Sequence, residues 1–83
     1  MAHYAPFSIT ITNVAGSLYD GMATLVTVPG ADGVTTVLAH HEPLITLLKK
    51  GKIHLVDEQG EEHAFAVESG VLEVSNSKTI ILV

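Results

Sequence analysis

The chain has 83 residues, which suffice for one domain, residues 1–83, and are too few for two. Four Lys, no Arg and nine acidic residues give a formal net charge of −5. This balance argues against a nucleic-acid binder, which needs a cationic face for the phosphates. The absence of Cys excludes a disulfide scaffold and a thiolate metal site. No apolar run approaches the roughly 18 residues of a membrane-spanning helix.

Strand patterns begin near the N-terminus. Alternating apolar and polar residues predict a half-buried strand at 7–12, and turn-forming residues at 13–16 end it. A β-branched run at 22–28 predicts the second strand. The Pro-Gly and Asp-Gly pairs within 29–33 predict a turn after it, because Pro has no amide hydrogen for a ladder bond and Gly allows positive φ. Another β-branched run at 34–39 predicts the third strand.

The second half of the chain continues this pattern after an irregular stretch at 40–43. The run 44–48 is ambiguous on propensity, but the Lys-Lys-Gly break that follows favours a short strand. Strands at 52–56 and 63–67 are predicted to form a hairpin whose polar tip is 57–62. The last two strands are predicted at 71–74 and 79–83.

The fold class follows from the number and spacing of these runs. About eight short strands with turn signals roughly every eight to twelve residues are typical of an all-β sandwich or barrel. We predict a small two-sheet antiparallel β-sandwich. Its predicted core consists of the apolar residues that alternate with polar neighbours, namely Ile9, Ile11, Val26, Val28, Ile53, Leu55, Leu72 and Val74.

Histidines are the candidate metal ligands. A zinc site needs three or four converging ligands. His40 and His41 are adjacent, so in an extended chain they would point to opposite faces. His54 and His63 fall on the two arms of the predicted hairpin and could face each other. Because no carboxylate is evident at ligand spacing beside them, we predict no metal site; His3 completes the set of five histidines.

Other chemistry-bearing patterns are missing. The serines lack a Gly-x-Ser-x-Gly elbow. Glu61 and Glu62 fall on the predicted hairpin tip, where solvation accounts for them. The Gly-rich residues 30–33 precede no helix that could present its N-terminus to a phosphate. The residues therefore predict a binding or structural module without a cofactor, and a hydrolase is only a third hypothesis.

Four segments follow one another in an order and spacing typical of one family. Residues 18–33 place an aromatic, a polar residue and Gly before a strand and a Pro-Gly-x-x-Gly turn. Residues 41–46 read His-Glu-Pro-Leu-Ile-Thr, and the segments 50–53 and 69–74 match two later strand motifs. Together they resemble the epsilon subunit of F-type ATP synthases, over nearly the whole chain.

The sequence departs from the family pattern at several places. Val14-Ala15 replace the usual Pro-Glu pair, Ala39-His40 replace Pro-Gly or Pro-Asn, and 34–36 replace a segment that often carries an acid and a Gly. Family members usually continue into a C-terminal pair of helices that these 83 residues do not contain. The resemblance thus implies a naturally short form or an N-terminal domain, which could not inhibit ATP hydrolysis by extending such helices.

The resemblance implies a non-catalytic subunit of the central stalk. It would join the gamma subunit to the ring of c subunits and couple proton or sodium translocation to ATP synthesis. It would be peripheral, at the cytoplasmic face of a bacterial inner membrane. The family's gamma-facing positions map onto Asn13, His41 and Thr46. The ring-facing turn maps onto Ala31, Asp32, Gly33, Val34 and Thr35.

Alternatives stay open beside that function. His41 could equally tie its own loop beside Pro43, and Gly33 and Gly70 could serve turn geometry alone. If the resemblance implies gamma contact at Thr46, then Thr46→Glu should weaken gamma binding and leave folding intact. The alternative function is a free-standing β-sandwich that binds a small ligand or a metal through His40, His41, His54 and His63.

Overall fold

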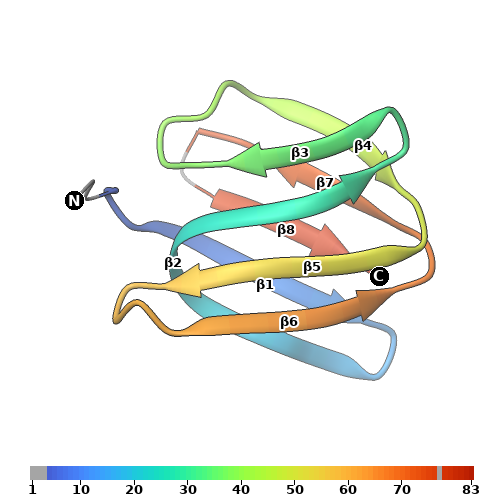
Figure 1. Ribbon diagram of the computed structural model, residues 1–83, viewed down its shortest axis with the longest axis horizontal. Helices are drawn as coiled ribbons and strands as arrows, with labels where there is room; N and C mark the ends of the chain where they lie inside the picture. The colour runs from blue at the N-terminus through green and yellow to red at the C-terminus, as the bar shows by residue number, and fades with distance from the viewer. Residues whose placement is uncertain (1–3, 77) are drawn as a thin grey trace.

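The computed structural model describes residues 4–76 and 78–83, and its strands are labelled in Figure 1. Within these ranges no helix forms, which confirms the all-β class predicted from the alternation. The strands are β1 (Phe7–Asn13), β2 (Gly16–Gly30), β3 (Gly33–Val37), β4 (Leu44–Leu48), β5 (Gly51–Asp57), β6 (Glu62–Val67), β7 (Gly70–Val74) and β8 (Lys78–Leu82).

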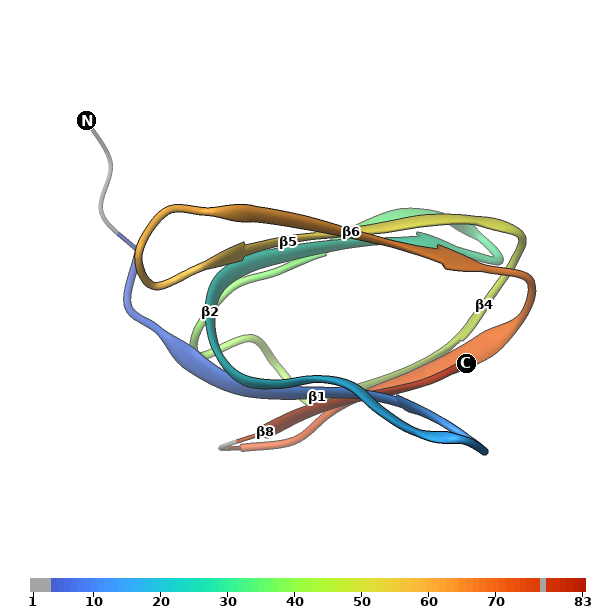
Figure 2. The same cartoon turned by 90° about the horizontal axis from the view of Figure 1, so that it is seen from below.

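Strand β2 belongs to both layers of the sandwich. Its first part, up to Ala23, pairs with β1, and its second part pairs with β3 and β5. One layer therefore contains β1, β8, β7 and β4, and the other contains β3, β5 and β6. Figure 2 shows β2 bending from one layer into the other. A register irregularity between Ala23 and Leu25 lies in this strand, and such bulges bend a strand locally.

The second strand begins earlier than the sequence predicted. Residues 16–21 are part of β2 and pair with β1, whereas a strand was expected only from Met22. Gly21 weakens the strand signal. Pairing holds the segment extended, because Tyr19 lies opposite Ile11 on the inner side and the Thr10 hydroxyl donates to Asp20 Oδ1 at 2.9 Å on the outer side.

The strand directions are antiparallel with one exception among the described pairings. β1 and β8 run parallel, with Ile9 beside Thr79 and Ile11 beside Ile81. All other registered pairs, including β4–β7 and β5–β6, are antiparallel. A parallel pair is possible here because β1 and β8 come from opposite ends of the chain, so no hairpin turn forces them to run antiparallel.

The core lies between the two layers. Each of the eight residues predicted for it is 5% exposed or less. The structure adds Ala23, Val37, Leu48, Val67 and Ile81 to this cluster.

The connections gather at two opposite ends of the sandwich (Figure 1). At one end the β2–β3 turn lies beside the β4–β5 connection, because the Ala31 amide donates to Leu47 O at 2.8 Å and the Lys49 amide donates to Pro29 O at 2.9 Å. The β5–β6 turn and the β3–β4 loop lie at the other end. This division separates the candidate surfaces described next.

Candidate functional site

The turn between β2 and β3 carries the residues that the resemblance assigned to the ring. Ala31 and Asp32 form its two-residue tip, and Gly30 pairs with Gly33 across it. Gly33 has a φ of +135°, which L side chains rarely adopt, so turn geometry accounts for this glycine. Val34 is 75% exposed, and Thr35 is half-buried. The structure therefore brings these five residues together at one end of the sandwich.

The three positions assigned to the gamma subunit lie in separate places. Asn13 ends β1, and its Oδ1 accepts hydrogen bonds from the amides of Ala15 and Gly16 at 2.8 and 3.2 Å. His41 lies in the β3–β4 loop, near the opposite end, and its Nδ1 donates to Glu42 O at 2.7 Å. Asn13 thus caps its own turn, and the His41 ring ties its own loop. The structure does not bring these side chains together with Thr46.

Thr46 lies on the inner side of its strand. It pairs with Leu72, which is fully buried, and it is itself half-buried. Because successive side chains on a strand point to opposite faces, Ile45 and Leu47 point outward, where they are 70% and 64% exposed. The outward side chains of β4 are therefore aliphatic.

These two residues belong to a larger apolar surface, which we call the outer patch. Leu47, Val71 and Leu82 lie side by side across β4, β7 and β8, and Leu82 is 51% exposed. In the next row Ile80 is separated from Ile45 by Glu73. The outer patch consists of Ile45, Leu47, Val71, Ile80 and Leu82.

The outer patch was missed in the sequence, although a signal for it exists. In the segments 44–48 and 79–83, apolar residues occupy both odd and even positions of the strand, not only alternate positions. Such runs are typical of strands covered on both faces. In this structure one of those faces is exposed, and a contiguous exposed apolar surface marks an interaction site.

The four described histidines do not converge. His54 pairs with Ala64, whereas His63 pairs with Leu55, so the two point to opposite faces of the hairpin and do not face each other. His40 is exposed in the β3–β4 loop, with a φ of +64°. His3 lies outside the described residues. A ligand site built from His40, His41, His54 and His63 therefore has no geometric basis here.

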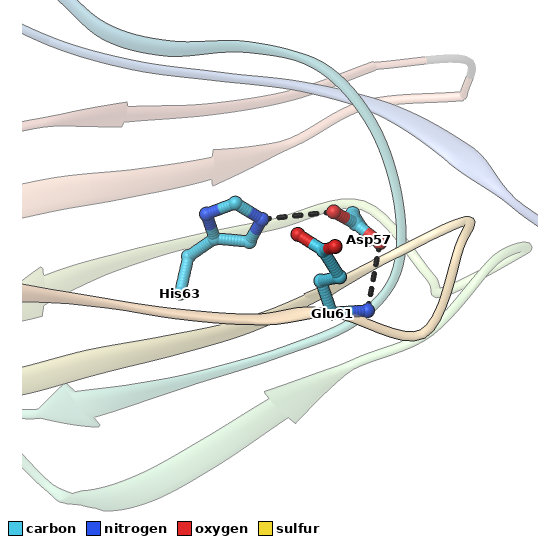
Figure 3. Close-up of side chains that lie close together, drawn as sticks. All are labelled: Asp57, Glu61 and His63. Atoms are coloured by element: carbon cyan, nitrogen blue, oxygen red, sulfur yellow. Dashed lines mark hydrogen bonds and ion pairs between the residues drawn. The ribbon is translucent and has the colours of Figure 1, made fainter.

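A carboxylate does lie beside one histidine, contrary to the sequence analysis. Asp57 ends β5 and is 8% exposed, and its Oδ2 accepts a hydrogen bond from His63 Nε2 at 2.9 Å (Figure 3). Its Oδ1 accepts from the amides of Gln59 and Glu61, each at 2.9 Å. Residues 57–62 were expected to be a solvated tip, but the tight turn aims the Asp57 side chain back at its own hairpin.

Hydrogen bonding sets the charge state of this group. The bond from His63 lowers the pKa of Asp57 below its ordinary value, and the amides of Glu61 and Gln59 act in the same direction against the opposing effect of burial.

Beside Asp57, the Tyr19 ring meets His63 edge-on at 5.3 Å and Phe65 at 6.3 Å between ring centroids. Burial, and after it the negative charges of Asp57 and Glu58, raise the pKa of Tyr19.

Comparison with known proteins identifies the family. Residues 6–83 match the family described as ATP synthase, Delta/Epsilon chain, beta-sandwich domain. The chain belongs to this family. The resemblance found in the four sequence segments is thereby confirmed.

Similar members of the delta/epsilon family are named ATP synthase epsilon chain. The one from Chlorobium limicola is 36% identical over 76 residues, which is 92% of this chain and 86% of that protein. Those from Sulfurimonas denitrificans and Dichelobacter nodosus are 43% and 35% identical, over 82% and 93% of this chain. The chain spans about half the length of these last two, 52% and 54%.

Solved structures show the same fold. A chain in the cryo-EM structure of the Euglena gracilis mitochondrial ATP synthase, described as OSCP/F1/c-ring, superposes with a TM-score of 0.87 at 19% identity. The match covers 98% of this chain and 52% of that one. The predicted β-sandwich is thereby confirmed.

Proposed function

We propose that this chain is an epsilon-type subunit of an F-type ATP synthase. It catalyses nothing itself, and its 83 residues form one stalk domain that joins the gamma subunit to the ring of c subunits. Family membership over residues 6–83 and the names of the relatives support this assignment. The observation that carries it is that the domain has two separate surfaces, an exposed apolar sheet face and an end formed by turns. A linking subunit needs two such contact surfaces.

The outer patch is the proposed surface for the gamma subunit. Specific interfaces have an apolar centre within a polar rim and bury about 800 Å² on each partner. Ile45, Leu47 and Leu82 supply exposed aliphatic side chains for such a centre. Toward β1 the surface becomes polar, with the Thr10–Asp20 hydrogen bond at its edge. This arrangement supports a docking surface with a defined boundary.

The positions carried over from the family keep a place in this proposal. Asn13, His41 and Thr46 remain the residues that the resemblance assigns to the gamma subunit. Thr46 lies on the same strand as the outward Ile45 and Leu47, so a partner on the outer patch would cover the backbone at Thr46. Asn13 and His41 would contact it only from the margins of that face.

The β2–β3 turn is the proposed contact for the ring. Ala31, Asp32, Gly33, Val34 and Thr35 form this turn. Val34 is 75% exposed, and Val14, in the β1–β2 turn at the same end, is fully exposed. The same end also carries charged side chains, because Asp32 in this turn and Lys49 in the adjacent β4–β5 connection are both exposed. A contact with the ring at this end would combine the apolar tips with these charges.

Location follows from the complex in this proposal. None of the described residues forms a helix of the length and apolarity that crossing a bilayer requires. The chain is held peripherally at the cytoplasmic face of a bacterial inner membrane by its partners, and the close-packed sandwich transmits rotation because such interiors have low compressibility. Proton and sodium motors are both compatible with this role.

A binding measurement with the gamma subunit from the same source tests the assignment. The variants are Leu47→Glu, in the outer patch, and Ala64→Glu, which is exposed on the outward side of β6 in the other layer. We expect the unmodified chain and Ala64→Glu to co-purify with gamma and Leu47→Glu to bind at least tenfold more weakly. Failure of the unmodified chain to bind gamma contradicts the function, and equal binding by both variants moves the interface elsewhere.

A further inference from the structure

The β5–β6 hairpin gathers three side chains that can ligate a metal ion, outside both surfaces proposed for partners. Asp57 and Glu61 each offer a carboxylate oxygen and His63 offers a ring nitrogen, and these atoms all lie within 4.8 Å of one another. Figure 3 shows the three side chains converging on one side of the hairpin tip. Histidine together with carboxylates is a donor set that zinc accepts in proteins.

Asp57 is already oriented as a ligand would be. Its Oδ1 is held by the amides of Gln59 and Glu61, which leaves Oδ2 directed toward His63. Ligating carboxylates in metal sites are commonly fixed by hydrogen bonds of this kind, because they lower the cost of ordering the ligand.

Binding one ion requires the three ligand atoms, which lie within 4.8 Å of one another, to move to tetrahedral spacing. Nε2 of His63 lies 2.9 Å from Oδ2 of Asp57. Two ligand atoms of a tetrahedral zinc ion, each about 2.0–2.1 Å from the metal, stand roughly 3.3–3.4 Å apart. The two atoms must therefore separate by about 0.4 Å, and Nε2 of His63 must give up the proton that it donates to Asp57. Tyr19 packs edge-on against the His63 ring, with 5.3 Å between the ring centroids.

The surrounding charge favours a cation. Glu58 and Glu62 lie between the three ligands in the sequence, and the segment 57–63 contains no Lys or Arg. Glu61 is exposed and His63 is partly so, which leaves room for water on the outer side of the ion. A site with three protein ligands and one open position has the coordination of the more accessible zinc sites in proteins.

We propose that Asp57, Glu61 and His63 bind one zinc ion, or a divalent transition-metal ion of similar size, with water as the fourth ligand. The bound ion would clamp the end of β5 to the start of β6. This proposal departs from the sequence-based prediction of no metal site, which rested on finding no carboxylate beside a histidine. It does not depend on the proposed stalk function.

Zinc chloride is the probe, added to the full chain after chelator treatment at pH 7. Every variant carries His3→Gln, so that the N-terminal histidine supplies no competing ligand. Isothermal titration and thermal unfolding are followed together. We expect one zinc per chain and, at saturation, a rise in Tm of roughly 5 °C or more, because a ligand that binds only the folded state stabilises it by mass action.

Variants locate the ion. Glu61→Gln keeps the backbone amide that holds Asp57 and changes an exposed side chain, so the fold should persist while zinc affinity falls at least tenfold. His63→Gln should lose binding as well. The controls are His54→Gln, on the opposite face of the same hairpin, and His41→Gln in the β3–β4 loop, which should leave affinity unchanged. Absence of zinc binding, retention of full affinity in Glu61→Gln and His63→Gln, or loss in either control would overturn the proposal.

Discussion

Thr46 of β4 pairs with Leu72 of β7, and both side chains lie on the inner side of their layer. Their neighbours Ile45 and Leu47 point outward. Pleating therefore divides β4 into positions whose substitution affects folding and positions whose substitution affects binding. The two consequences can be measured separately, because stability needs no partner.

Thr46→Glu is expected to destabilise the chain by about 1–3 kcal/mol, since it places a carboxylate on the half-buried inner side beside Leu72. This revises the expectation from the resemblance that the same substitution leaves folding intact. Ile45→Glu, one residue away and 70% exposed, should change stability by no more than about 0.5 kcal/mol. Urea unfolding of both variants measures the contrast, and equal stability of the two would show that the Thr46 side chain faces solvent.

Leu72→Ala probes the centre of the core. Leu72 is 0% exposed, so removing its side chain loses transfer free energy and leaves a cavity, at a cost of about 2–5 kcal/mol. Glu73→Ala is the matched control on the same strand, because Glu73 is exposed. It should cost no more than about 0.5 kcal/mol. A Leu72→Ala cost as small as that of the control, measured by urea unfolding, would show that Leu72 faces solvent.

The inner face of this sandwich could be predicted from sequence because alternation reports it directly. Leu72 and Val74 are separated by a Glu, and Ile53 and Leu55 by a His, so a period of two assigns all four inward. Alternation cannot assign the faces of a strand in which both odd and even positions are apolar, as in 44–48. There the family motif identified Thr46 but did not indicate which face of the strand its side chain occupies. A motif specifies residue types in order and contains no information on which face of the strand a side chain occupies.

The hairpin ligands could not be predicted for a different reason. Asp57 stands at the boundary between a strand and a polar turn, and a polar residue there reads as solvated. Its burial follows from the amides of Gln59 and Glu61, whose positions depend on how the turn closes. The same applies to β2, whose first part becomes a strand through pairing with β1 and not through its own propensity.

Gly70→Ala tests a close approach of two backbones. A Cβ at Gly70 would collide with the carbonyl of Leu82 at the end of β8, and a backbone carbonyl cannot swing away as a side chain can. We expect a loss of about 1–3 kcal/mol. At Gly21 a Cβ would meet the Tyr19 hydroxyl at 3.6 Å and the ring at 3.7 Å, both ordinary contacts, so Gly21→Ala should be neutral or slightly stabilising. Thermal unfolding distinguishes the two, and a neutral Gly70→Ala would mean that β8 does not lie against β7 at this point.

Acid should remove the contribution of Asp57 to stability in metal-free buffer. The hydrogen bond from His63, followed by the amides of Glu61 and Gln59, lowers the pKa of Asp57 from its ordinary value of 3.8. A carboxyl whose folded-state pKa lies below its unfolded-state pKa stabilises the fold at pH values above the unfolded-state pKa. This stabilisation disappears as the pH falls through the folded-state pKa.

In EDTA at pH 6, the unmodified chain should therefore be more stable than Asp57→Asn, which cannot ionise. The difference should shrink steadily below about pH 4, because the protonated Asp57 then resembles the amide. Urea midpoints at several pH values between 6 and 2.5 measure it, and comparing the two proteins cancels the titration of the other acidic groups. A difference that stays constant across this range would mean that the Asp57–His63 hydrogen bond does not favour the ionised carboxylate.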